Sequence, residues 1–164
     1  MTARMRSPVF VLPNAMQTVL ALNGPVDHGN VPAVTLKLVD LRASQINGCG
    51  LCVDMHSHEL KKMDQTQERI FAVAAWRDAP WFTDAERAAL ALTEAVTRLA
   101  DREDPVPDSI WDEAARHYDE TGLATLVLAI AKINIWNRLN VATRQPSNAW
   151  RTAAPVRAAV AAAS

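Results

Sequence analysis

The segment from Gly122 to Thr143 limits the fold more than any other part of the chain. It is apolar on most of its faces and much longer than a typical β-strand, so it is predicted to be a helix. A helix that is apolar around most of its circumference is normally covered on several sides by other elements. We therefore expect this segment to be the central helix of an all-α fold.

The rest of the chain carries helical signals of the same kind. Five glycines and an apolar share of 49%, rich in Ala and Leu, favour helices over strands. After Pro32, apolar residues recur at Val34, Leu38 and Leu41, which gives one helical stripe. Helices are predicted over 14–22, from 32 to the break at Asn47-Gly48, and over 49–62, 66–77, 83–99, 108–118 and 122–143.

Two of the predicted helices begin with a capping-box pattern. Asp64 with Gln67 precedes the helix at 66–77, and Thr83 with Glu86 precedes the helix at 83–99. In such a box the first side chain accepts a backbone N–H and the second reaches back to the N-cap. Both pairs therefore predict where a helix starts.

No linker long enough to divide the chain is present, so one helical domain that assembles into homo-oligomers is expected. Residues 1–31 are predicted to be a loosely structured N-terminal segment with one short helix. Residues 32–145 form the predicted core, and residues 146–164 an Ala-rich C-terminal tail.

Charge and hydropathy exclude several classes of partner. The chain has 17 basic and 18 acidic residues, a net charge of −1, and no basic stripe, so no nucleic acid is expected. The longest apolar runs, such as 123–131, are shorter than the ~20 residues of a membrane span, and no signal-peptide core is evident. A cytoplasmic location is predicted, where two cysteines point to redox, catalytic or metal chemistry.

The two cysteines occur as a CxxC pair, with a histidine one helical turn further on. On a helix, Cys49 and Cys52 are about 60° apart around the axis, and His56 falls between them. The i, i+3 and i, i+4 spacings bring the three side chains close together. A helix N-terminus lowers thiol pKa values, and histidine titrates near neutrality. Two thiols, a base and a helix start are the components of a peroxide-reducing thiol centre.

Other interpretations of the CxxC pair are possible. An inert structural pair is one, and a zinc site of Cys49, Cys52, His56 and His58 is another. Because His58 would lie about 180° from Cys49, one helix can offer only three of the four ligands. No metal site is therefore expected, and a thioredoxin fold would need a βαβ context that is absent.

A few large or polar residues elsewhere carry weaker signals. Trp76, Trp81 and Trp136 are expected to pack in the core or at a subunit interface rather than against a substrate. Asn134 and Asn137 lie on an otherwise apolar helix and are expected either to fix an interface or to line the site.

These motifs resemble those of a known family. The run 41–49, continued by Cys52-Val53-Asp54-Met55-His56, resembles the alkylhydroperoxidase D family of the carboxymuconolactone decarboxylase-like superfamily. The similarity extends through 74–77, 82–90 and 133–139, and so spans roughly 32–144.

The resemblance implies an all-helical fold, homo-oligomers (trimers or hexamers) and thiol-dependent peroxidase activity. It implies that Cys52 attacks the peroxide, Cys49 resolves the product to a disulfide, and His56 belongs to a proton relay. It further implies no bound cofactor, and an external dithiol of the lipoyl type as the electron donor.

The chain departs from the family pattern at one relay position. The family has a glutamate twelve residues before the first cysteine, where this chain has Lys37. Asp40, on a neighbouring face of the same predicted helix, is a candidate replacement. Some family members have a histidine between the two cysteines, and this chain differs from them because it has Leu51 there.

The sequence thus predicts a CxxC peroxidase for organic hydroperoxides or hydrogen peroxide. The alternative is an oligomeric thiol-disulfide sensor or disulfide reductase with little peroxide turnover. Lactone ring-opening or decarboxylation is disfavoured, because the branch with that activity does not depend on a CxxC pair.

Overall fold

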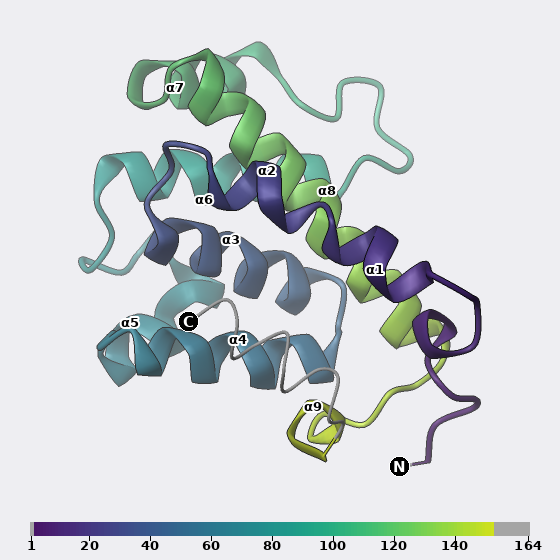
Figure 1. Ribbon diagram of the computed structural model, residues 1–164. Coiled ribbons are helices and arrows are strands. Elements are labelled where there is room, and N and C mark those ends of the chain that lie inside the picture. Colours follow the sequence, from purple (N-terminus) through teal and green to yellow (C-terminus); the bar gives the residue numbers. More distant parts are fainter. Residues whose placement is uncertain (1, 153–164) are drawn as a thin grey trace.

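The computed structural model describes residues 2–152, which are helical without β-strands (Figure 1). The all-α prediction is therefore confirmed. In chain order the elements are η1 (Pro8–Phe10), α1 (Ala15–Leu20), α2 (Asn23–Asp27), α3 (Ala33–Ile46), α4 (Gly50–Lys62), α5 (Gln67–Ala72), η2 (Val73–Ala75), α6 (Asp84–Thr97), α7 (Asp108–His117), α8 (Glu120–Ala142) and α9 (Ala149–Thr152). The part of the predicted Ala-rich tail after residue 152 lies outside the described residues.

Helix α3 lies between α4, α6 and α8 and contacts all three. Its residues Leu38 and Leu41 are fully buried in one apolar cluster with residues of α4, α5 and α6. Val39, on another face of α3, packs in a second cluster with residues of α6, α7 and α8. The helix therefore holds both halves of the core together, and its C-terminal end leads directly into α4.

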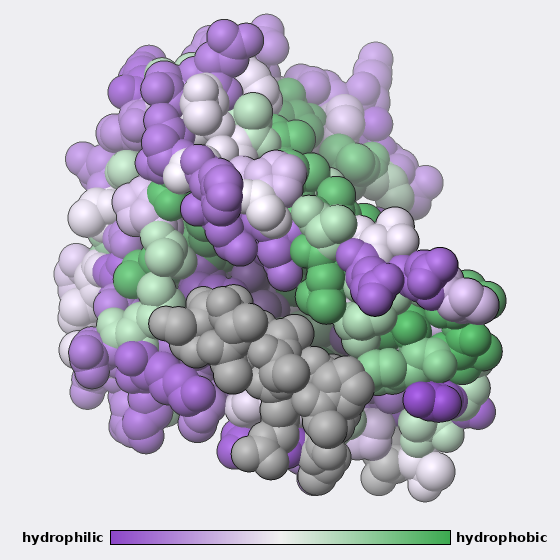
Figure 2. Space-filling view, viewed as in Figure 1, coloured by the Kyte–Doolittle hydropathy of each residue, from purple (hydrophilic) through white to green (hydrophobic). Residues whose placement is uncertain are grey.

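The long helix α8 packs against α2, α3, α4, α6 and α7, in line with its predicted central place. One edge nevertheless stays exposed, since Ile135 and Val141 keep 38% and 43% of their surface accessible. Figure 2 shows apolar residues gathered over α8 and over the N-terminal segment around α1. Within residues 2–152, no helix is long and apolar enough to cross a membrane.

The N-terminal segment contains more structure than the single predicted helix. It forms η1, α1 and α2, and α2 packs against α8. The backbone N–H of Arg4 donates to the carbonyl of Thr143 at 2.9 Å, and Val26 is fully buried in the core. These long-range contacts, which no local pattern announces, hold the segment against the end of α8.

One capping prediction is confirmed and the other is wrong. Thr83 and Glu86 form the predicted capping box at the start of α6. At α5 the N-cap is Thr66, whose side chain accepts the N–H of Arg69. Asp64 instead takes a left-handed conformation (φ 57°) in the turn after α4, so it cannot cap the following helix.

Glu94 on α6 is a buried acceptor for donors from α3, from the turn after η2 and from the end of its own helix. Its carboxylate accepts from Trp76 Nε1 (2.9 Å) and Arg42 Nε (2.7 Å). It also accepts from Arg77 (3.0 Å) and Arg98 (3.2 Å). Burial would raise the pKa of Glu94, but the hydrogen bonds from Trp76, Arg42 and Arg77 lower it to about 2.

We expect Glu94→Gln to lower the free energy of unfolding at pH 7 by about 3 kcal/mol, because it removes the buried charge that pairs with Arg42, Arg77 and Arg98. The pKa of Glu94 is lower in the folded chain than in the unfolded one, so its contribution is complete above about pH 5 and is lost as the pH falls toward 2. Urea unfolding of both proteins over this pH range measures the difference. Equal stability at pH 7 would contradict the assignment.

Candidate active site

The site begins with a tight turn between α3 and α4. Asn47 caps α3, and Gly48 follows with φ +66°, a left-handed conformation that glycine adopts without strain. Cys49 is then the N-cap of α4, and its Sγ accepts the backbone N–H of Cys52 at 3.4 Å. The turn therefore places the first thiol at a helix N-terminus, where a negative charge is stabilised.

A buried network of side-chain amides fixes this turn to α8. Asn47 Nδ2 donates to the side-chain oxygens Oδ1 of Asn134 and Asn137, each at 2.9 Å. Asn137 Nδ2 in turn donates to Ser44 Oγ on α3 at 3.1 Å. The sequence left two roles open for these asparagines, and the structure supports a third: they join α3, the turn and α8 directly behind the cysteines.

The three predicted site residues lie together on the buried side of α4. Cys49, Cys52 and His56 keep only 2%, 1% and 4% of their surface accessible. Both cysteines are free thiols. Cys52 and His56 line a partly open cavity, whereas Cys49 packs beside it in a cluster with Ala43 and Ile133.

The two thiols have different electrostatic surroundings. The hydrogen bond with the Cys52 thiol lowers the pKa of Cys49. Burial opposes this effect, and the hydrogen bond from the Cys52 backbone N–H adds to it. The same bond between the two thiols, together with burial, raises the pKa of Cys52. In the reduced pair a negative charge is therefore favoured on Cys49, and the proton is held on Cys52 beside the cavity.

His56 is held by a carboxylate that the sequence motifs did not indicate. His56 Nδ1 lies 2.8 Å from Glu59 Oε2, one turn further along α4. Because the carboxylate accepts, Nδ1 carries a hydrogen, and the neutral ring keeps its lone pair on Nε2. Within residues 2–152, His56 Nε2 is buried and has no hydrogen-bond partner. The i, i+3 spacing of His56 and Glu59 was the available signal.

Lys37 and Asp40 complete a charged cluster around this histidine. Lys37 Nζ lies 3.1 Å from Glu59 Oε2 and 3.7 Å from Asp40 Oδ2. Asp40 Oδ2 is 3.8 Å from His56 Nδ1, which is beyond hydrogen-bond distance. Glu59, on the histidine's own helix, therefore makes the hydrogen bond to His56 Nδ1, while Asp40, the replacement that the sequence suggested, lies beside the pair without such a bond.

The pKa values in this cluster keep its charges in place at neutral pH. Burial would raise the pKa of Glu59, but the hydrogen bond and charge of His56 and the charge of Lys37 lower it to about 2. Burial would lower the pKa of Lys37, but Asp40 and Glu59 raise it above its usual value. The glutamate therefore stays ionised and the lysine stays protonated.

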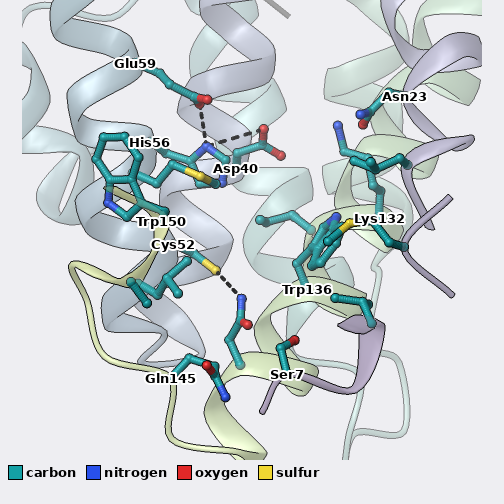
Figure 3. A pocket seen from close by; sticks show the side chains of 18 of the residues that line it. Ser7, Asn23, Asp40, Cys52, His56, Glu59, Lys132, Trp136, Gln145 and Trp150 are labelled. Atoms are coloured by element: carbon teal, nitrogen blue, oxygen red, sulfur yellow. Dashed lines mark hydrogen bonds and ion pairs between the residues drawn. The ribbon is translucent and has the colours of Figure 1, made fainter. Parts of the chain in front are cut away.

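The cavity beside Cys52 has a volume of about 210 Å³. One wall comes from α3 and α4 and the other from α8, where Trp136 faces Cys52 and His56 across the space (Figure 3). Apolar side chains of η1, α1, α8 and α9 cover much of the remainder: Val9, Phe10, Met16, Leu20, Ile133 and Trp150. Trp136 therefore lines the cavity, whereas the sequence favoured packing, and Trp76 is buried in the core as expected.

His58 lies away from the cysteines, with its ring 5.4 Å from that of Trp150. Among residues 2–152, no group of three or more His, Cys, Asp or Glu side chains is arranged to hold a metal ion.

Comparison with known proteins gives a family. Residues 13–95 match the carboxymuconolactone decarboxylase family. This chain belongs to that family. A curated relative in this group is the uncharacterised protein YdfG of Bacillus subtilis, which is 34% identical over 132 residues, 80% of this chain and 88% of YdfG.

Two further relatives connect this carboxymuconolactone decarboxylase family member to the alkylhydroperoxidase D proteins, as the sequence motifs predicted. The alkyl hydroperoxide reductase AhpD of Hyphomonas neptunium is 43% identical over 47 residues, 29% of this chain and 26% of that protein. A crystal structure of an Agrobacterium tumefaciens protein of unknown function, with a suggested role in antioxidant defence (AhpD), has a TM-score of 0.82 and 33% identity. The superposition covers 88% of this chain and 97% of that one, so the fold is shared throughout.

We expect Gly48→Ala to lower the free energy of unfolding by about 1–2 kcal/mol, because a Cβ at φ +66° is strained. The added methyl group would meet no atom within 4 Å, so the cost is conformational and not a clash. Gly24→Ala is the matched control, since its methyl group is equally unobstructed and its position is helical. Denaturant unfolding of both variants tests this, and equal effects would contradict it.

Proposed function

We propose that this protein is a CxxC-dependent peroxidase in which Cys52 reduces an organic hydroperoxide or hydrogen peroxide. The observation that carries the proposal is that Cys52 and His56 line the same cavity, with Cys49 beside Cys52, and that His56 Nε2 has no hydrogen-bond partner among residues 2–152. A nucleophilic sulfur, a proton carrier and a resolving thiol are the groups that the reaction needs.

In the first step the Cys52 thiolate attacks the terminal oxygen of the hydroperoxide. An S–O bond forms, the O–O bond breaks, and sulfur supplies two electrons. The departing alkoxide takes one proton and leaves as an alcohol. The Cys52 proton passes to His56 Nε2, and the protonated imidazole then gives this proton to the alkoxide.

In the second step Cys49 resolves the Cys52 sulfenic acid. The Cys49 sulfur attacks the Cys52 sulfur, the S–S bond forms and the S–O bond breaks. The hydroxide takes a proton from the Cys49 thiol or through His56 and leaves as water. An external dithiol, of the lipoyl type, then reduces the disulfide and becomes a cyclic disulfide itself. No bound cofactor takes part in this cycle.

Glu59 replaces the family's relay glutamate in this proposal. Its carboxylate orients the His56 ring and stabilises the imidazolium that forms when Nε2 accepts a proton. Lys37 stands at the position of the family glutamate and pairs with Glu59. The buried negative charge of Glu59 therefore has an opposite charge beside it.

The cavity favours substrates with an apolar body. A cavity of about 150 Å³ lined by apolar side chains is large enough for benzene, and this one has about 210 Å³. A small alkyl or aryl hydroperoxide can therefore bury its apolar part against Trp136 and the N-terminal segment. Homo-oligomers, trimers or hexamers, are part of the proposal as well, with the exposed apolar edge of α8 as a candidate contact.

A thiol-disulfide sensor or disulfide reductase is the second candidate. The burial of both cysteines and the lysine at position 37 favour it, because they would slow peroxide turnover without preventing disulfide formation. Steady-state turnover separates the two functions.

We expect Cys52→Ser to reduce peroxide turnover at least about a hundredfold, because a serine hydroxyl is not ionised at neutral pH. Cys49→Ser should still consume one equivalent of hydroperoxide but should not cycle, since the resolving thiol is missing. Turnover is measured with cumene hydroperoxide and reduced lipoamide. A Cys52→Ser variant that retains wild-type turnover would show that Cys52 is not the attacking residue.

We expect Glu59→Gln to lower kcat/KM for hydroperoxide about tenfold, because the neutral amide orients His56 less firmly and does not stabilise its imidazolium. Glu103→Gln, at an exposed loop position, is the matched control and should leave kcat/KM unchanged. If both variants behave like the wild type, Glu59 has no part in the relay.

A further inference from the structure

Asn140 on α8 contacts the sulfur of Cys52. Its Nδ2 lies 3.4 Å from Cys52 Sγ, a distance suited to an N–H···S hydrogen bond. The side chain keeps only 8% of its surface accessible and lines the cavity together with Cys52 and His56.

The register of α8 fixes the direction of this amide. Asn134, Asn137 and Asn140 follow one another at intervals of three residues on the inner side of the helix. The first two are tied to Asn47 in the turn before Cys49, and Asn137 is also tied to Ser44. These bonds prevent α8 from rotating relative to α4, so the third amide stays directed at the sulfur.

Both sulfurs of the pair thereby have a hydrogen-bond donor, and Asn140 also lowers the pKa of Cys49. Cys49 Sγ accepts the backbone N–H of Cys52 at the helix start, and Cys52 Sγ accepts the side-chain N–H of Asn140. A hydrogen bond to a charged acceptor is worth more than one to a neutral acceptor, so such donors favour the thiolate over the thiol.

The charged groups around the cavity include one that also favours a Cys52 thiolate, because the charge of His56 lowers the pKa of Cys52. They are Asp27 on α2, Lys37 and Asp40 on α3, His56 and Glu59 on α4, and Lys132 on α8. Lys37 is bound to both Glu59 and Asp40, so its charge is compensated within the cluster. Asn140 therefore adds a neutral hydrogen-bond donor to the charge of His56 in stabilising a thiolate at Cys52.

We propose that Asn140 is a catalytic hydrogen-bond donor that stabilises negative charge on Cys52 Sγ in both halves of the redox cycle. This role rests on the proposed thiol peroxidase function. During oxidation it stabilises the thiolate that attacks the peroxide. During reduction, a donor thiolate attacks Cys49, the S–S bond breaks, and its electron pair moves to Cys52, whose departure as a thiolate the same N–H assists.

The test measures thiolate formation at Cys52 alone, in a Cys49→Ser background that leaves one thiol per chain. Thiolate absorbance at 240 nm is recorded against pH for Cys49→Ser and for Cys49→Ser/Asn140→Leu. Leucine has a similar volume and no donor, so we expect the midpoint to rise by about one pH unit. At neutral pH, the rate of oxidation of Cys52 by cumene hydroperoxide should fall about tenfold in parallel.

Asn23→Leu in the same background is the matched control, because Asn23 lines the cavity from α2 and has no hydrogen bond to either sulfur in the described residues. Its midpoint should equal that of the parent. If Asn140→Leu does not fold, Asn140→Ala replaces it, with a smaller rise expected because water can enter the space. Coincident midpoints for parent and Asn140 variant would overturn the proposal. The titration needs no turnover, so it tests the role of Asn140 even in a protein that fails as a peroxidase.

Discussion

The buried bond between Asn47 and the amides of α8 is the interaction on which the site depends. It holds the left-handed turn at Gly48 in one position relative to both α3 and α8. That turn decides which residue becomes the N-cap of α4, and hence which thiol receives a backbone N–H. Buried amides are costly unless they are paired, so a network of this kind has one stable arrangement. The same network sets the direction of Asn140 toward the other thiol.

The charged cluster shows how a lysine is accommodated where the family resemblance places a glutamate. A lysine near a histidine would oppose protonation of the ring if its charge were free. Here Lys37 and His56 share one oxygen of Glu59 as their acceptor, and the pKa of Glu59 falls to about 2. The carboxylate that contacts the histidine thus comes from α4, whereas the family glutamate would come from α3. His56 has an acidic partner on Nδ1, and its Nε2 has no hydrogen-bond partner among residues 2–152.

Local signals were sufficient for much of the fold. The predicted helices at 49–62, 83–99 and 108–118 agree with α4, α6 and α7 to within one or two residues, because caps and breaks mark their ends. The α5 start was misplaced because Asp64 and Thr66 are both good caps, and only the geometry of the turn after α4 selects between them. The division of the N-terminal segment into short helices follows from its contacts with α8, which no local pattern contains.

Only the part of the candidate site that lies on one helix, α4, could be predicted from the sequence. The spacing of Cys49, Cys52 and His56 was enough to place them together, because all three belong to the start of α4. Glu59 lies on the same helix, but the family pattern directed attention to Asp40 on α3. Trp136 and Asn140 could not be assigned, since their roles depend on how α8 crosses α4. Side chains that meet across two packed helices are set by tertiary geometry, and a single sequence does not specify it.

The central claim is that Cys49 and Cys52 form a peroxide-driven dithiol–disulfide pair, and a thiol count tests it most directly. The wild-type protein is counted before and after one equivalent of cumene hydroperoxide, and again after reduced lipoamide. We expect the loss of two thiols per chain, an intramolecular Cys49–Cys52 disulfide in the peptide map, and full recovery with the dithiol. Two thiols that stay free after peroxide would contradict the claim, as would an oxidised pair that the dithiol does not restore.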